Sequence, residues 1–118
     1  MILQDDNGFG LFLGNFQHST DVKGLQECGV TWVLNVASEH MYENGFDPRD
    51  IYGDSFTYLG IAMDDVPGYY IAKHFSKTND FVHRAHESCA KILVHCRAGR
   101  SRSAAVVMAY LIGRFVSV

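Results

Sequence analysis

The segment that most restricts the fold is a short stretch in which an apolar run changes abruptly into a basic, glycine-containing loop. Residues 91–95 (KILVH) have the apolar, β-branched composition of a buried strand. Residues 96–102 (CRAGRSR) follow as a loop, and residues 103–116 return to the close apolar spacing of a buried helix. A buried strand that leads directly into a helix is typical of α/β proteins with parallel strand pairs.

The remaining pattern predicts the same class. The chain alternates strands and helices over 118 residues, which is the length of one domain. Further strands are predicted at 10–16, 31–36 and 57–61, with loops at 37–56 and 63–69. One helix is predicted to begin at Ser19 or Thr20 and to end at Gly29, and a second to begin at Ile71. The apolar stripe of this second helix consists of Ile71, Phe75, Thr78, Val82 and Ala85, with Phe81 beside it.

Composition excludes several classes of function. A net charge of −3 argues against binding nucleic acid through overall charge. The longest apolar run, Ala104–Ile112, is about half of the roughly 18 residues that a membrane span needs. The start of the chain lacks the basic and apolar regions of a signal peptide. We therefore expect no membrane span and a cytoplasmic location, with the nucleus as the alternative.

The loop at 96–102 has the properties of a phosphate-binding site. A loop between a strand and a helix directs several backbone N–H groups to one point, and the helix dipole adds partial positive charge there. Gly99 removes a Cβ atom where the backbone must curl. The planar guanidinium of Arg102, at the start of the helix, can hold two phosphate oxygens together.

Cys96 opens this loop and is the candidate nucleophile. The field that binds phosphate also favours a thiolate, so the pKa of this thiol is expected below the free value of about 8.5. A thiolate directed at a bound phosphoryl group is placed for in-line displacement. Ser103 can donate a hydrogen bond to the sulfur, and His95 can fix the loop through its ring nitrogens.

The sequence HCRAGRSRS contains the Cys-x5-Arg signature of protein tyrosine phosphatases and in its fuller form resembles the dual-specificity phosphatases. The segments LFLGNF, TWVLNVA, YLGIAMDD and FVHRA resemble the small atypical members related to the vaccinia enzyme. This resemblance implies a phosphatase-like fold with a central, mostly parallel sheet flanked by helices. It implies phosphoprotein substrates, a phosphocysteine intermediate, and no metal or other cofactor. The implied phosphate-binding residues are Arg97, Ala98, Gly99, Arg100, Ser101 and Arg102.

A proton donor for the leaving oxygen is expected in the loop after residues 57–61. In the resembled family the acid follows the apolar residue that ends the strand by four positions, and counting from Ile61 gives Asp65. The adjacent Asp64 is the alternative. No Trp-Pro-Asp triplet occurs, which agrees with the dual-specificity type rather than the tyrosine-specific one.

Two other functions remain open at this point. The family's domains usually continue with further helices, which this chain lacks after Val118, so a catalytically weak phospho-binding module is one alternative. The uncovered helix at 103–116 would then favour self-association. Phosphoinositide phosphatases of the superfamily carry basic residues at the positions of Arg97 and Arg100, so an inositol lipid is a weaker alternative substrate.

Two cysteines and five histidines lie outside this constellation, and of the histidines only His83 and His86 form a pair. Cys28 is expected in the core, on the apolar side of the first helix. Cys89 is expected in a loop, with a role as a resolving thiol as the alternative. His83 and His86 are expected on a solvated helix face.

Overall fold

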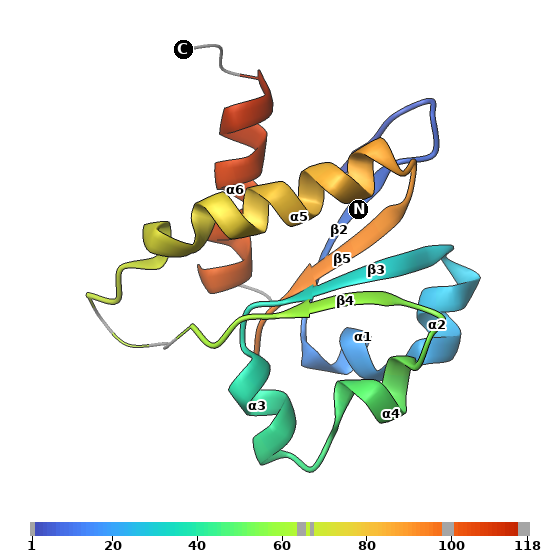
Figure 1. Cartoon of the computed structure of the whole chain (residues 1–118), viewed down its shortest axis with the longest axis vertical. Coiled ribbons are helices and arrows are strands. Elements are labelled where there is room, and N and C mark those ends of the chain that lie inside the picture. Colours follow the sequence, from blue (N-terminus) through green and yellow to red (C-terminus); the bar gives the residue numbers. More distant parts are fainter. Residues whose placement is uncertain (1, 64–65, 67, 98–100, 116–118) are drawn as a thin grey trace.

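The computed structural model describes residues 2–63, 66, 68–97 and 101–115, and of Ser101 and Phe115 only the backbone. It contains a five-stranded sheet in the order β1-β2-β5-β3-β4 (Figure 1). The strands are β1 (Leu3–Gln4), β2 (Gly10–Gly14), β3 (Val30–Asn35), β4 (Thr57–Gly60) and β5 (Lys91–His95). The β2–β5, β5–β3 and β3–β4 ladders are parallel, and β1 pairs with β2 in antiparallel fashion.

Helices cover both faces of the sheet, because the strands bury side chains on both sides. In β5, Ile92 and Val94 belong to one apolar cluster, whereas Leu93 belongs to the other. The first cluster packs under α5 and α6, and the second packs against the short helices α1 to α4 (Figure 1). The helices are α1 (Phe16–Thr20), α2 (Val22–Glu27), α3 (Ser38–Glu43), α4 (Pro48–Tyr52), the 3₁₀ helix η1 (Ile71–His74), α5 (Phe75–Glu87) and α6 (Ser101–Phe115).

The predicted class, a mostly parallel sheet flanked by helices, is confirmed. The four predicted strands are present, each within one or two residues of its expected ends. The predicted stripe of the long helix is also confirmed, since Thr78, Phe81, Val82 and Ala85 are buried along α5. Gly29 has a φ angle of 78°, the left-handed conformation expected after a helix end.

The loop predicted at residues 37–56 is wrong, because this segment contains α3 and α4. Asp47 caps α4 by accepting a hydrogen bond from the backbone N–H of Arg49, and Pro48 occupies the first turn. An Asp-Pro pair marks a helix start as readily as a turn, because proline fits a position whose N–H needs no partner within the helix. Both helices are too short to show an apolar period.

The helix predicted to begin at Ser19 or Thr20 and to end at Gly29 is present as α2, but its N-cap is Asp21 and neither of those residues. The chain forms two short helices, whose N-caps are Asn15 and Asp21. The side chain of Asn15 accepts from the N–H of His18 at 3.0 Å. Ser19 is instead buried within the first of these helices.

The predictions for Cys28 and His86 are wrong as well. Cys28 is exposed, because it follows the last turn of α2 as its C-cap and lies beyond the buried stripe. His86 is mostly buried and its Nε2 lies 3.0 Å from Asp5 Oδ2, so the start of the chain covers this part of α5. His83, in contrast, is exposed as predicted.

None of the helices in the described part of the chain combines the length and hydrophobicity that a bilayer crossing requires.

Candidate functional site

The candidate site lies at the carboxyl ends of the central strands. His95 ends β5 between two parallel neighbours, paired with Gly14 of β2 and with Asn35 of β3. The chain then leaves the sheet at Cys96 and enters α6 at Ser101. Ligand sites of open α/β sheets typically lie at this edge, because the loops that leave the strands gather there.

Cys96 and Ser103 are in contact across this turn. The Sγ atom of Cys96 lies 3.2 Å from Ser103 Oγ, and both residues are buried. The first turn of α6 carries Ser103 back over the end of β5, so the helix itself positions the hydroxyl. A hydroxyl at this distance can donate a hydrogen bond to a thiolate.

Arg102 is buried, with only 4% of its area exposed. Its guanidinium donates to the backbone oxygen of Met63 at 2.5 Å and to Glu39 Oε1 at 3.4 Å. These partners come from the segment after β4 and from α3, so two separate parts of the chain orient the arginine. The sequence did not single out Glu39, since a lone glutamate in a segment expected to be a loop carries no signal of its own.

His95 is the last residue of β5 and is 1% exposed. Its Nδ1 atom is 3.4 Å from the carbonyl oxygen of Cys96. Because a carbonyl only accepts, this contact places the proton on Nδ1. Burial lowers the pKa of His95 from 6.5 to about 4, although the contact with the Cys96 carbonyl opposes this shift. The ring is therefore neutral at neutral pH, and it contacts the backbone at the point where the chain leaves the sheet.

Asn35 is a further buried polar residue at this edge, and sequence reasoning missed it. Its side chain accepts from the N–H of Ala37 at 2.8 Å and donates to the hydroxyl of Tyr58 at 3.1 Å. These bonds hold the turn from β3 into α3, the helix that carries Glu39. A polar residue at the end of an otherwise apolar strand is the signal that would have found it.

Several predicted site residues lie outside the described residues. They are Asp64, Asp65, Ala98, Gly99 and Arg100, together with the side chain of Ser101. Arg97 is described and exposed. Within the described ranges, no three His, Cys, Asp or Glu side chains gather as the ligands of a metal ion would.

This arrangement of a thiol at a strand end and an arginine at a helix start, on a parallel sheet between two helical layers, is that of the cysteine-based phosphatase fold. The chain belongs to the family of dual specificity phosphatase catalytic domains, whose model matches residues 11–116.

Individual relatives agree with this assignment. The chain is 39% identical to mouse dual specificity protein phosphatase 2 over 102 residues, which is 86% of this chain and 30% of that protein. It is 40% identical to human dual specificity protein phosphatase 26 over 103 residues, which is 86% of this chain and 47% of that protein. The chain therefore spans less than half the length of these curated relatives.

The structure is also similar to that of the human tyrosine phosphatase-like serine/threonine/tyrosine-interacting protein. The TM-score is 0.76 at 32% identity, and the match covers 92% of this chain and 72% of that one.

Proposed function

We propose that this chain is a protein phosphatase that hydrolyses phosphotyrosine and phosphoserine or phosphothreonine through a phosphocysteine intermediate. The observation that carries the proposal is the buried contact of Cys96 with Ser103, in a chain whose Arg102 guanidinium is held by the carbonyl of Met63. Family membership supports the same chemistry.

In the first step the Cys96 thiolate attacks phosphorus. A phosphorus–sulfur bond forms while the bond to the substrate oxygen breaks, and Asp65 gives that oxygen a proton. Arg102 and the backbone N–H groups of residues 97–102 stabilise the charge on the transferring phosphoryl group. Asp65 has this role because of its place in the sequence, with Asp64 as the alternative.

In the second step a water molecule attacks the phosphocysteine. Asp65, now a carboxylate, takes a proton from the water, and the phosphorus–sulfur bond breaks to release inorganic phosphate. The sulfur leaves as a thiolate, and the hydroxyl of Ser103 donates a hydrogen bond to it. Neutral His95 supports the backbone of Cys96 by donating from Nδ1 to its carbonyl oxygen.

The test is turnover of an activated aryl phosphate by the purified chain, followed by phosphotyrosine and phosphoserine peptides. We expect Cys96→Ser to lower turnover about a thousandfold or more. Cys89→Ser is the matched control, because Cys89 is exposed and should be dispensable. Substantial turnover by folded Cys96→Ser would contradict the proposal.

The same assays separate the alternative functions. Tight binding of a phosphopeptide without turnover would favour a binding module. Faster turnover of an inositol lipid than of any phosphopeptide would favour a phosphoinositide phosphatase.

Self-association through α6 is a further prediction. Met108 and Ile112 on this helix each expose more than half of their area. Light scattering over a range of concentrations tests it, and a constant monomer mass would contradict it.

A further inference from the structure

A cavity of about 260 Å³ lies between α2 and the sheet, and the proposed phosphatase chemistry does not use it. We call it the α2 cavity. Leu25, Val30 and Leu93 in its wall belong to the apolar cluster on the face of the sheet opposite α5 and α6 (Figure 1). The α2 cavity has room for about nine water molecules, or for one aromatic ring with a short chain. The apolar side chains that line it are Phe12, Leu13, Leu25, Val30 and Leu93.

The α2 cavity exists because the inward face of α2 carries few large side chains. Asp21, Gly24, Leu25 and Cys28 follow the i, i+3, i+4, i+7 spacing of one helix face, and all four line the cavity. Of these, only Leu25 is buried within α2. Gly24 has no side chain and Cys28 has a short one, so two positions that face the sheet leave the space between the layers unfilled.

Polar side chains stand at the mouth of the α2 cavity. His18, Asp21 and Cys28 are exposed and line it. The Nδ1 atom of His18 accepts a hydrogen bond from the backbone N–H of Asn15 at 3.0 Å, so the neutral ring carries its proton on Nε2. The mouth therefore presents a carboxylate, a thiol and one ring N–H above an apolar interior.

The carboxylate of Asp21 is held in place by the start of α2. Its Oδ1 atom accepts a hydrogen bond from the backbone N–H of Gly24 at 3.1 Å, as the N-cap of the helix. A Cβ atom at position 24 would collide with this carboxylate, so the glycine permits its position. A group that is already oriented loses less conformational entropy when it binds a ligand.

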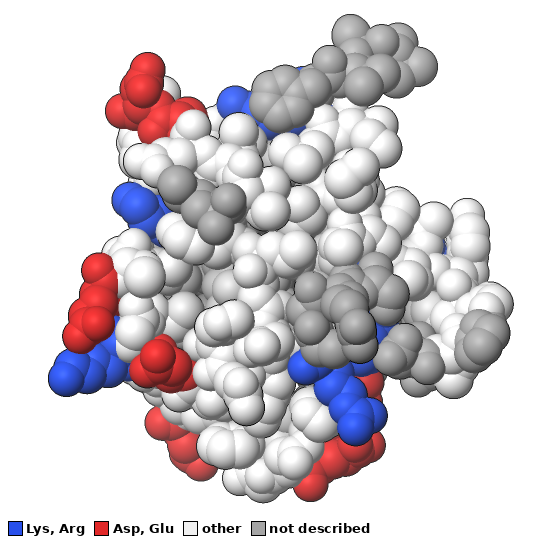
Figure 2. Space-filling view, turned by 180° about the vertical axis from the view of Figure 1, so that it is seen from behind, with Lys and Arg blue, Asp and Glu red and all other residues white. Residues whose placement is uncertain are grey.

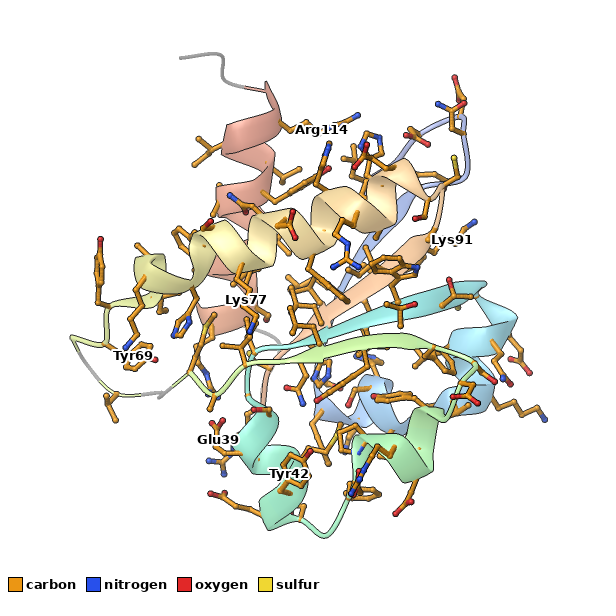
Figure 3. The ribbon with its side chains drawn as sticks, viewed as in Figure 1. Glu39, Tyr42, Tyr69, Lys77, Lys91 and Arg114 are labelled. Carbon is orange, nitrogen blue, oxygen red and sulfur yellow. The ribbon has the colours of Figure 1, made fainter. Side chains whose placement is uncertain are left out.

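No described basic side chain pairs with Asp21, which takes part in no salt bridge within the described ranges. The stem of Lys91 passes close to Gly29, just after α2. Its Nζ atom, however, lies 3.5 Å from the carbonyl oxygen of Gly8 and is directed toward the turn before β2 (Figure 3). On the face shown in Figure 2, acidic and basic side chains are interspersed around the margin, so no broad field of one sign outweighs a local carboxylate there.

We propose that the α2 cavity binds a small amine that carries an aromatic ring, with the ring in the apolar interior and the ammonium group at Asp21. The volume fits one ring, the ring of Phe12 adds an aromatic surface to the wall, and the carboxylate at the mouth favours a cationic end. Small-molecule sites typically combine such an apolar lining with a few polar groups that fix the orientation of the ligand. Binding in this cavity does not depend on the proposed phosphatase activity.

The test titrates the purified chain with benzylamine, benzyl alcohol and benzoate, which share the ring and differ in the charge at its end. Proton–nitrogen correlation NMR follows the binding, and we expect the shifts to concentrate at the backbone amides of residues 12–13, 24–28 and 93. At low salt benzylamine should bind about twofold to fivefold more tightly than benzyl alcohol, because the ion pair forms at an exposed carboxylate. Benzoate should bind most weakly.

The preference for the amine should depend on Asp21. In Asp21→Asn the amide still caps α2 while the charge is lost, so we expect benzylamine and benzyl alcohol to bind equally. Asp80→Asn on α5, another exposed aspartate, is the control and should keep the preference.

Filling the mouth should abolish binding of all three compounds. Cys28→Phe places a ring at the mouth of the α2 cavity, whereas Gln26→Phe places the same ring on the exposed side of the same helix and is the matched control. In the unmodified chain, benzylamine should also slow the alkylation of Cys28 by iodoacetamide. Cys89, which is likewise free and exposed, serves as the internal reference and should react at an unchanged rate.

Three results would overturn the inference. The first is equal affinity of the unmodified chain for the three compounds, and the second is a preference for benzylamine that survives in Asp21→Asn. The third is an unchanged alkylation rate of Cys28 at saturating benzylamine, since the amine would then bind elsewhere.

Discussion

The Sγ atom of Cys96 lies 3.2 Å from the Oγ atom of Ser103, although a change from strand to loop to helix separates the two residues. The contact exists because α6 begins at Ser101 and its first turn returns over the end of β5. A hydroxyl in this position serves the second chemical step, in which sulfur is the leaving group, more than the first.

Ser103→Ala should therefore slow release of phosphate from the phosphocysteine. A hydrogen bond to a charged group contributes about 1.5–3 kcal/mol, so we expect the steady-state rate to fall roughly tenfold to a hundredfold. Rapid-quench kinetics should show a burst of leaving group followed by slow turnover. Ser76→Ala, an exposed serine on α5, is the control. A loss of the burst itself would assign Ser103 to the first step.

Glu39→Gln should weaken phosphate binding, because Glu39 Oε1 helps to orient the guanidinium of Arg102. The carbonyl of Met63 still holds the arginine, so we expect KM to rise only about threefold to tenfold, with a smaller change in kcat. Inhibition by inorganic phosphate should weaken by the same factor.

Glu43→Gln is the control for this variant, since Glu43 is an exposed residue on the same helix. A fall in kcat with unchanged KM would show that Glu39 acts in the transition state and not as a positioning residue.

The buried ring of His95 predicts that stability falls in mild acid. Its pKa is lowered to about 4 in the folded chain, against about 6.5 when unfolded. Between these values the unfolded chain binds the extra proton, so stability is full above about pH 6.5 and declines as the pH falls toward 4. Over this pH range the titration of His95 lowers the free energy of unfolding by about 3 kcal/mol.

Urea denaturation between pH 7 and 4.5 measures this dependence. In His95→Asn, whose amide can still donate to the Cys96 carbonyl, we expect the free energy of unfolding to depend less steeply on pH. His83→Asn, at an exposed histidine, should keep the full dependence. If the free energy of unfolding of His95→Asn fell with pH as steeply as that of the unmodified chain, other groups would cause the loss of stability in acid.

Asp65→Ala should slow the hydrolysis of substrates with poor leaving groups more than that of substrates with good ones. A phosphoserine oxygen needs a proton as it leaves, whereas an activated aryl oxygen does not, so we expect losses of about a hundredfold or more for the first and much smaller losses for the second. Asp64→Ala is the matched control. Equal losses for both substrates in Asp65→Ala would move the acid to another residue.

The sequence by itself determined the fold class and the candidate nucleophile. Apolar strands such as β5 and the stripe of α5 are local patterns, and their periods follow directly from backbone geometry. The phosphate-loop signature is also local, because consecutive residues form the strand end, the loop and the helix start. The short helices α3 and α4 escaped prediction because five or six residues are too few to show a period.

Only the tertiary structure decided what surrounds the loop. Glu39, Asn35 and Met63 come from segments far from Cys96 in the chain, and no spacing rule connects them. Their places follow from the packing of helices on the two faces of the sheet, which brings separate loops to one edge. The sequence specifies the reacting groups, and the long-range packing of the chain decides how Arg102 is oriented beside them.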